Sequence, residues 1–227
     1  MNIESFKQHF HPNWWRHLKP FLESKDFEHI WNKIKALGVK NRIVYPYSKL
    51  LKELHSNIEN TIFKPFLFDF DNLEVLILSE IVPNTFTNPL NLGQILKTND
   101  YYNAVEKSVY NGLNLNMIRN NDLSYLNEQN VMILGNSLTC EVEISHYLIW
   151  EEMIKFIIKV INETHKGLHI ILLGNNKRYE KLLNKENHYI YNCSLDYDNY
   201  DMFNIINERM LKNQDKIINW ALDKPPF

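Results

Sequence analysis

Four short apolar runs limit how this chain can fold. They occupy residues 74–78, 131–135, 168–173 and 188–191. Each run is continuous rather than alternating, which is typical of strands that are buried on both faces of a parallel sheet. Helical patterns separate the runs. This alternation predicts an α/β fold with three layers, α/β/α, around a central four-stranded parallel sheet.

The helical patterns lie before and between the apolar runs. The clearest spans residues 147–163, where apolar residues recur every three or four positions and charged residues fill the opposite face. Residues 1–70 are predicted to be mainly helical and to form the N-terminal part of the same domain. We expect a single domain over residues 1–227, because this length suits one large α/β domain and no repeat or linker divides it.

Composition narrows the functional classes. The formal net charge of −2 gives no overall attraction for DNA, so DNA binding would need a local basic patch. Cys140 and Cys193 are too few for a disulfide framework or an iron–sulfur cluster. No apolar stretch reaches about 18 residues, so we expect a cytoplasmic protein without a membrane segment. Abundant Asn, Ile, Lys and Tyr suggest the AT-rich genome of a phage or a low-GC bacterium.

Several segments occur in the order and spacing of uracil-DNA glycosylase motifs. The stretch NVMILGNSLTCEVEISHYLIW reads as a strand, a short loop, a Ser-His pair and a helix beginning near a Trp. The stretch LHIILLGNN reads as a strand that ends in a Gly turn. Nearly the whole chain resembles this superfamily, and the resemblance implies its fold. The matching positions are Tyr45, Pro46, Ser145, His146, Trp150, Gly174, Ile218 and Trp220.

The catalytic motifs of that family are degenerate in this chain. In the family, the first strand ends in GQDPYH, whose Asp orients the attacking water. Here the strand is followed by SEIVPN, and an ungapped alignment places Ile81 at the Asp position. The family's HPSPLS motif supplies a His that hydrogen-bonds the base, and Ser194 lies near that position. The resemblance implies that both catalytic groups are missing.

The base pocket is altered in the same way. The family reads the base edge with an Asn three positions before the Leu of its LTV element, and Leu138 puts Gly135 at that position. Asn136 is displaced by one residue, which on a strand means the opposite face. The stacking Phe is replaced by Leu92 or a nearby non-aromatic residue. Asn84 is a further candidate for the pocket.

A few residues could still carry chemistry. Glu80 stands at a motif position that is acidic in other branches of the superfamily, although a solvent-exposed Glu is the simpler interpretation. His146 and His188 are remaining imidazoles, for which we favour structural, hydrogen-bonded roles. Lys177 and Arg178 follow a strand and could face a phosphate, but a solvated helical turn is the better interpretation.

We expect no cofactor and no metal. His9 and His11 lie close together in the sequence, but no Asp, Glu or Cys completes a recognisable metal site, and surface histidines are the simpler interpretation. The acidic group at 196–201 lacks the register of a calcium loop and its closing Glu. It is predicted to be a polar loop.

Two functional classes remain. We favour a pseudoenzyme: a non-enzymatic recognition or accessory subunit in a DNA replication, repair or transcription assembly, with a protein partner and possibly DNA. The poxvirus enzyme, which is also a polymerase processivity component, is a precedent within the family. The alternative is a DNA N-glycosylase for a modified pyrimidine, with Glu80 activating water and Asn136 or Asn84 reading the base. An acidic decoy has less support. Candidate contact residues are Tyr101, Tyr102, Tyr110, Tyr189, Tyr191, Tyr197 and Tyr200.

Overall fold

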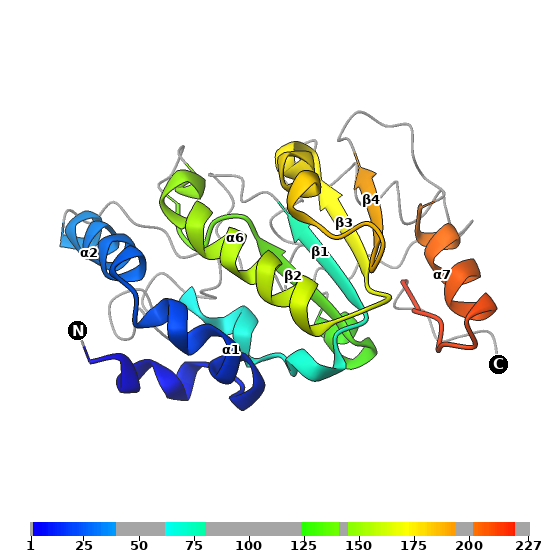
Figure 1. Ribbon diagram of the computed structural model, residues 1–227, viewed down its shortest axis with the longest axis horizontal. Coiled ribbons are helices and arrows are strands. Elements are labelled where there is room, and N and C mark those ends of the chain that lie inside the picture. The colour runs from blue at the N-terminus through cyan, green and yellow to red at the C-terminus, as the bar shows by residue number, and fades with distance from the viewer. Residues whose placement is uncertain (1, 40–61, 80–123, 141–144, 194–201, 221–227) are drawn as a thin grey trace.

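Four parallel strands form the centre of the protein (Figure 1). The computed structural model describes residues 2–39, 62–79, 124–140, 145–193 and 202–220. The strands lie in the order β2 (Val131–Gly135), β1 (Val75–Ser79), β3 (His169–Leu173) and β4 (Tyr189–Cys193). Each neighbouring pair is parallel. The predicted central four-stranded parallel sheet is therefore confirmed.

Burial explains why the strands were visible in the sequence. Every residue of β1, β2 and β3 is buried, whereas β4 is half-buried along its whole length. Strands with two buried faces need continuous apolar sequence. β4 is an edge strand, and it mixes tyrosines with Asn192 and Cys193.

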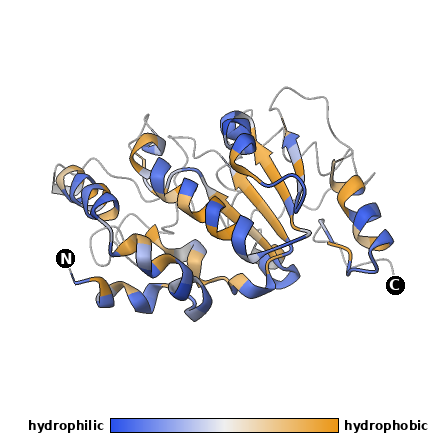
Figure 2. Cartoon of the chain, viewed as in Figure 1, coloured by the Kyte–Doolittle hydropathy of each residue, from blue (hydrophilic) through white to orange (hydrophobic). Residues whose placement is uncertain are grey.

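Helices cover one face of the sheet. This layer contains α1 (Pro12–Leu22), α2 (Lys25–Val39) and α6 (Tyr147–Thr164). The strand side chains that join this core include Leu76, Leu134 and Leu172. The seven buried side chains of α6 carry its apolar stripe, as the sequence predicts. Figure 2 shows the same separation, with apolar residues concentrated on the strands and polar residues on the outer sides of the helices.

The opposite face of the sheet has its own core. The alternate strand residues, such as Ile77, Ile133 and Ile171, pack with the helix α7 (Met202–Lys212) and with Trp220. The rings of Phe203 and Trp220 lie 4.6 Å apart. The sheet therefore has a helical layer on each face, which confirms the predicted three-layer α/β/α architecture.

The N-terminal segment is fixed to the sheet domain by aromatic packing. It contains the 3₁₀ helices η1 (Ile3–His9), η3 (Lys64–Leu67) and η4 (Phe70–Asn72) besides α1 and α2. The ring centroid of Phe63 lies 4.8 Å from that of Phe10 and 5.6 Å from that of Phe6. The Trp14 and Phe70 rings are 4.1 Å apart. These contacts join the N-terminal helices to the chain that enters β1.

The described histidines near the N-terminus differ from the expectation of surface residues. His9 is buried, and His11 caps α1 while its Nδ1 lies 3.5 Å from an oxygen of Asp69. Within the described ranges, no group of three or more His, Cys, Asp or Glu side chains is placed to hold a metal ion. None of the helices described there has the length and apolar character needed to cross a membrane.

Candidate functional site at the carboxyl edge of the sheet

The carboxyl ends of the strands gather several buried polar residues. In open parallel sheets, ligands bind at this edge. The strands end at Ser79, Gly135, Leu173 and Cys193. Ser79, Asn136 and Asn176 are all buried there. This edge is therefore the candidate functional site.

Gly135 is the last residue of β2 and pairs with Ser79 of β1. The next residue continues the contact, because the Asn136 N–H donates to the Ser79 carbonyl oxygen across 2.8 Å. The structure thus places Gly135 at the end of a buried strand, where the sequence match puts the base-reading residue. Glycine has no side chain with which to read a base.

Asn136 is engaged inside the protein. Its Nδ2 donates to Oδ1 of Asn176 across 2.9 Å, and Nδ2 of Asn176 donates to the Leu78 carbonyl oxygen across 3.0 Å. A carbonyl oxygen can only accept, so the Leu78 contact identifies the nitrogen of Asn176 and, in turn, that of Asn136. We call Asn136, Asn176 and the Leu78 carbonyl the amide brace.

The turn after β3 creates the amide brace. Gly174 has a positive φ of 62°, a conformation that glycine adopts without steric cost, and it begins the 3₁₀ helix η8 (Gly174–Leu182). The β1–β3 register ends at Leu78 and Leu172. Asn176 then supplies an amide donor to the end of β1 from its side chain. The brace therefore connects the ends of three adjacent strands.

Asn176 is a site residue that the sequence pattern does not predict. The Asn-Asn pair after Gly174 was the available signal, but the same segment also suggested a phosphate-binding turn. Asn176 is completely buried. A buried side-chain amide requires hydrogen-bond partners, and here it has two across the strand ends.

A second polar network supports the start of α6. The Thr139 hydroxyl oxygen accepts from Nε1 of Trp150 across 2.8 Å and lies 3.0 Å from Nδ1 of His146. The His146 N–H also donates to the Thr139 carbonyl across 3.3 Å. His146 is buried within this network. It therefore contributes to the scaffold, as we expected.

Arg178 differs from the expected solvated turn. Lys177 is exposed, but Arg178 is half-buried and its guanidinium carbon lies 4.3 Å from the Tyr147 ring centroid. Its Nη2 also donates to the Tyr179 hydroxyl across 3.1 Å. Burial raises the pKa of Tyr179, and the nearby Arg178 opposes that shift. Arg178 thus joins η8 to α6, and its charge is stacked on tyrosine.

His188 lies at the other end of the sheet, because it precedes β4. It is buried, which fits a structural role. However, neither ring nitrogen has a hydrogen-bond partner among the described residues, so the expectation of a hydrogen-bonded histidine is not met there. Burial lowers the pKa of His188, and the neighbouring His165 lowers it further.

The thiols of Cys140 and Cys193 are expected to have low reactivity. Burial raises the pKa of Cys140 to about 12 and also raises the pKa of Cys193. A thiol with a raised pKa holds little of the reactive thiolate at neutral pH. Neither residue is therefore a candidate nucleophile.

The other candidate residues of the site lie outside the described part of the chain. These are Glu80, Ile81, Asn84, Leu92 and Ser194. The acidic group at 196–201 also lies outside it, as do Tyr101, Tyr102, Tyr110, Tyr197 and Tyr200. The roles assigned to them remain predictions from sequence.

The fold of this protein is similar to that of several solved structures. No protein-family model matches the sequence, and no curated protein matches it at a significant level. Among solved structures, mimivirus uracil-DNA glycosylase has a TM-score of 0.78 at 14% identity, over 96% of this chain and 89% of that one. A point variant of mimivirus UNG in complex with UGI has a TM-score of 0.79 at 15% identity, over 98% and 92%.

A bacterial structure extends the comparison. UNG from Nitratifractor salsuginis has a TM-score of 0.57 at 12% identity, over 91% of this chain and 94% of that one. The similarity spans nearly all of each chain, although few residues are shared. With the parallel sheet and its two helical layers, it shows that this chain has the uracil-DNA glycosylase fold.

Proposed function

We propose that this protein is a catalytically degenerate member of the uracil-DNA glycosylase fold. It acts as a non-enzymatic recognition or accessory subunit in a DNA replication, repair or transcription assembly. The observation that carries the proposal is the end of β2, where Gly135 has no side chain and the next residue, Asn136, is held in the amide brace by its bond to Asn176.

Base excision needs a polar group that reads the base edge. A glycosylase flips its target nucleotide into a pocket and holds the Watson–Crick edge by hydrogen bonds. Gly135 offers no such group from its side chain. Turning Asn136 outward would break its bond to Asn176 and strand a buried amide oxygen, at a cost of about 1–3 kcal/mol. The brace therefore opposes the use of Asn136 as a base reader.

The sequence predictions support the same function. Ile81 stands at the position of the water-orienting carboxylate, and Ser194 stands near the position of the base-binding His. An isoleucine cannot accept a hydrogen bond from water through its side chain. Loss of the water-orienting, base-binding and base-reading groups together favours a protein that no longer excises bases.

The partner we propose first is a protein, with DNA second. The net charge of −2 gives no general attraction for phosphates. At the carboxyl edge, Arg178 is stacked on Tyr147 rather than extended into solvent. The mimivirus UNG variant in complex with UGI shows that a protein of this fold can engage a protein partner. We propose a cytoplasmic site of action and no cofactor or metal.

The competing hypothesis is an N-glycosylase with a rebuilt site, in which Glu80 activates water. An excision assay separates the two. Fluorescent single-stranded and duplex oligonucleotides that contain uracil, hydroxymethyluracil or thymine are incubated with the full chain, first at substrate excess and then at protein excess. Mimivirus uracil-DNA glycosylase serves as the positive control.

We expect no excision by this protein under either condition. Excision that disappears in a Glu80→Gln variant would overturn the proposal and establish a glycosylase. Fluorescence anisotropy on the same oligonucleotides shows whether DNA is a partner. Binding without excision supports an accessory role on DNA, and the absence of both directs the search to protein partners.

A further inference from the structure

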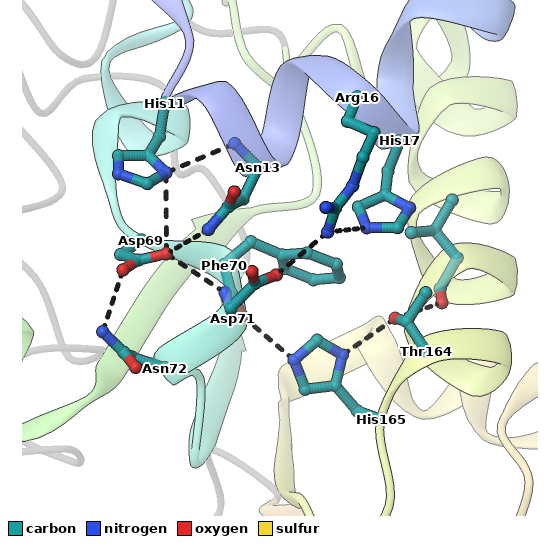
Figure 3. Close-up of polar contacts among 11 residues, drawn as sticks. His11, Asn13, Arg16, His17, Asp69, Phe70, Asp71, Asn72, Thr164 and His165 are labelled. Carbon is teal, nitrogen blue, oxygen red and sulfur yellow. Dashed lines mark hydrogen bonds and ion pairs between the residues drawn. The ribbon is translucent and has the colours of Figure 1, made fainter.

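His165 connects the end of α6 to η4 at the amino end of the sheet. It follows α6, and its Nε2 lies 2.9 Å from the Phe70 carbonyl oxygen of η4. Its ring packs edge-on against the Phe70 ring, with 4.4 Å between centroids. Figure 3 shows His165 next to Thr164 at the end of α6 and beside the Phe70 ring. His17 of α1 also packs against that ring.

Hydrogen bonding fits both charge states of His165. The Phe70 carbonyl only accepts, so Nε2 carries a hydrogen. The Thr164 hydroxyl lies 2.8 Å from Nδ1 of His165 and 2.7 Å from the Val160 carbonyl oxygen. With a neutral ring, this hydroxyl donates to Nδ1. With a protonated ring, Nδ1 donates to the hydroxyl oxygen, and the hydroxyl hydrogen turns to Val160. Each state is satisfied without moving a heavy atom.

The two neighbouring histidines lack this property. Nε2 of His17 lies 3.2 Å from Nη2 of Arg16, and a guanidinium only donates, so Nε2 of His17 must accept. Protonation of His17 would break that contact. His188 is buried, and its ring nitrogens have no partner among the described residues. A cation there would lack hydrogen bonds.

Charged and titratable groups from several elements act on His165. Asp71 of η4 favours a proton on His165, whereas a charged His17 of α1 opposes it. His188, before β4, also interacts electrostatically with His165. Arg16 of α1 lies 3.4 Å from Asp71 and partly neutralises it. Burial lowers the pKa of His165 most strongly, and its bond to the Phe70 carbonyl raises it.

We propose that His165 and the Thr164 hydroxyl form a proton-responsive joint, the histidine joint, between the end of α6 and η4, in which the hydroxyl reverses its hydrogen bond to Nδ1 when His165 gains a proton. The charged His165 keeps both hydrogen bonds, so one proton changes the charge beside Phe70 without breaking the link between α6 and η4.

Imidazole NMR on the full chain tests this proposal. Long-range ¹H–¹⁵N spectra of labelled protein are recorded from pH 8 to pH 5. We expect the neutral His165 ring to carry its hydrogen on Nε2 and the neutral His17 ring to carry its hydrogen on Nδ1. His165 should protonate at a higher pH than His188, whose ring nitrogens have no partner among the described residues. A neutral His165 ring with its hydrogen on Nδ1 would overturn the proposal.

Variants of Thr164 separate the hydroxyl's role from simple packing. Thr164→Ser keeps the rotating hydroxyl and should keep the His165 titration midpoint. Thr164→Val removes the hydroxyl. The charged His165 then loses an acceptor for its Nδ1 hydrogen, which costs more than the loss of a donor to the neutral ring. The titration midpoint of His165 should therefore fall by about one pH unit. Equal midpoints in the two variants would contradict the proposal. Thr164 is exposed, so neither change disturbs the core.

Discussion

The side-chain amide of Asn136 donates to the side-chain oxygen of Asn176 across 2.9 Å, although the residues are 40 positions apart in the chain. Through Asn176 the contact continues to the carbonyl oxygen of Leu78. The ends of β1, β2 and β3 are therefore held together at the edge where ligands bind in open parallel sheets. In this protein, the side-chain amides of Asn136 and Asn176 at that edge are hydrogen-bonded within the protein.

The amide brace should contribute measurably to stability. Asn176→Ala removes both hydrogen bonds and leaves the Leu78 carbonyl and the Asn136 amide without these partners. We expect the free energy of unfolding to fall by about 1–3 kcal/mol. Asn176→Asp should cost more, because a carboxylate cannot donate to Leu78. Urea denaturation at pH 7 measures the change.

The matched control for the brace is Lys177→Ala, one residue further along η8. Lys177 is exposed, so this change should alter the free energy of unfolding by less than about 0.5 kcal/mol. Equal stability of the Asn176→Ala and Lys177→Ala variants would show that the brace adds nothing.

The Thr139 network should also depend on a single hydroxyl. Thr139→Val leaves the indole N–H of Trp150 buried without its acceptor, and we expect a loss of about 1–3 kcal/mol in the free energy of unfolding. Thr139→Ser keeps the hydroxyl and should recover most of it. Thermal unfolding followed by circular dichroism compares the two variants. A serine variant as unstable as the valine variant would refute the role of the hydroxyl.

Aromatic packing should dominate the N-terminal segment. Phe63 is completely buried and contacts the rings of Phe6, Phe10 and Trp31. Phe63→Ala should therefore cost about 3–5 kcal/mol. Leu67→Ala is the control, since Leu67 is 53% exposed, and it should cost less than about 0.5 kcal/mol. Similar urea midpoints for both variants would contradict this packing.

His169 should make stability fall in acid. Burial, and then the charge of Arg209, lowers the pKa of His169 to about 4, below its ordinary value of 6.5. Its Nδ1 lies 3.0 Å from the Tyr191 hydroxyl. As the pH falls below 6.5, His169 binds a proton in the unfolded chain but stays neutral in the folded chain until the pH approaches 4. The folded state should therefore lose up to about 3 kcal/mol between pH 6.5 and pH 4.

Urea denaturation at several pH values between 7.5 and 4.5 measures this slope. His169→Phe keeps an aromatic ring against Tyr189 and Tyr191 but removes the titrating group. Its stability should depend less on pH over this range. An unchanged slope would assign the acid sensitivity to other residues.

The sheet was predictable because burial on both faces leaves a continuous apolar sequence. The runs at 74–78 and 131–135 coincide with β1 and β2 to within one residue. The helix at 147–163 was also predictable, since its apolar stripe follows the helical period. Local patterns of this kind need no knowledge of distant contacts.

The brace and the histidine joint were not predictable in the same way. Asn136 and Asn176 meet only because Gly174 turns the chain after β3. His165 contacts the Phe70 carbonyl, 95 residues earlier in the chain, and that contact depends on how α6 lies on the sheet. Such contacts depend on tertiary geometry, which local composition does not record.

The central claim is that this fold has lost base excision. The most direct measurement is single-turnover cleavage of a single-stranded oligonucleotide with one uracil, with the protein in large excess, since a single-stranded substrate removes the cost of opening a duplex. The account predicts no abasic product above a protein-free blank. Abasic product that forms with the natural chain and is lost in Glu80→Gln would contradict it.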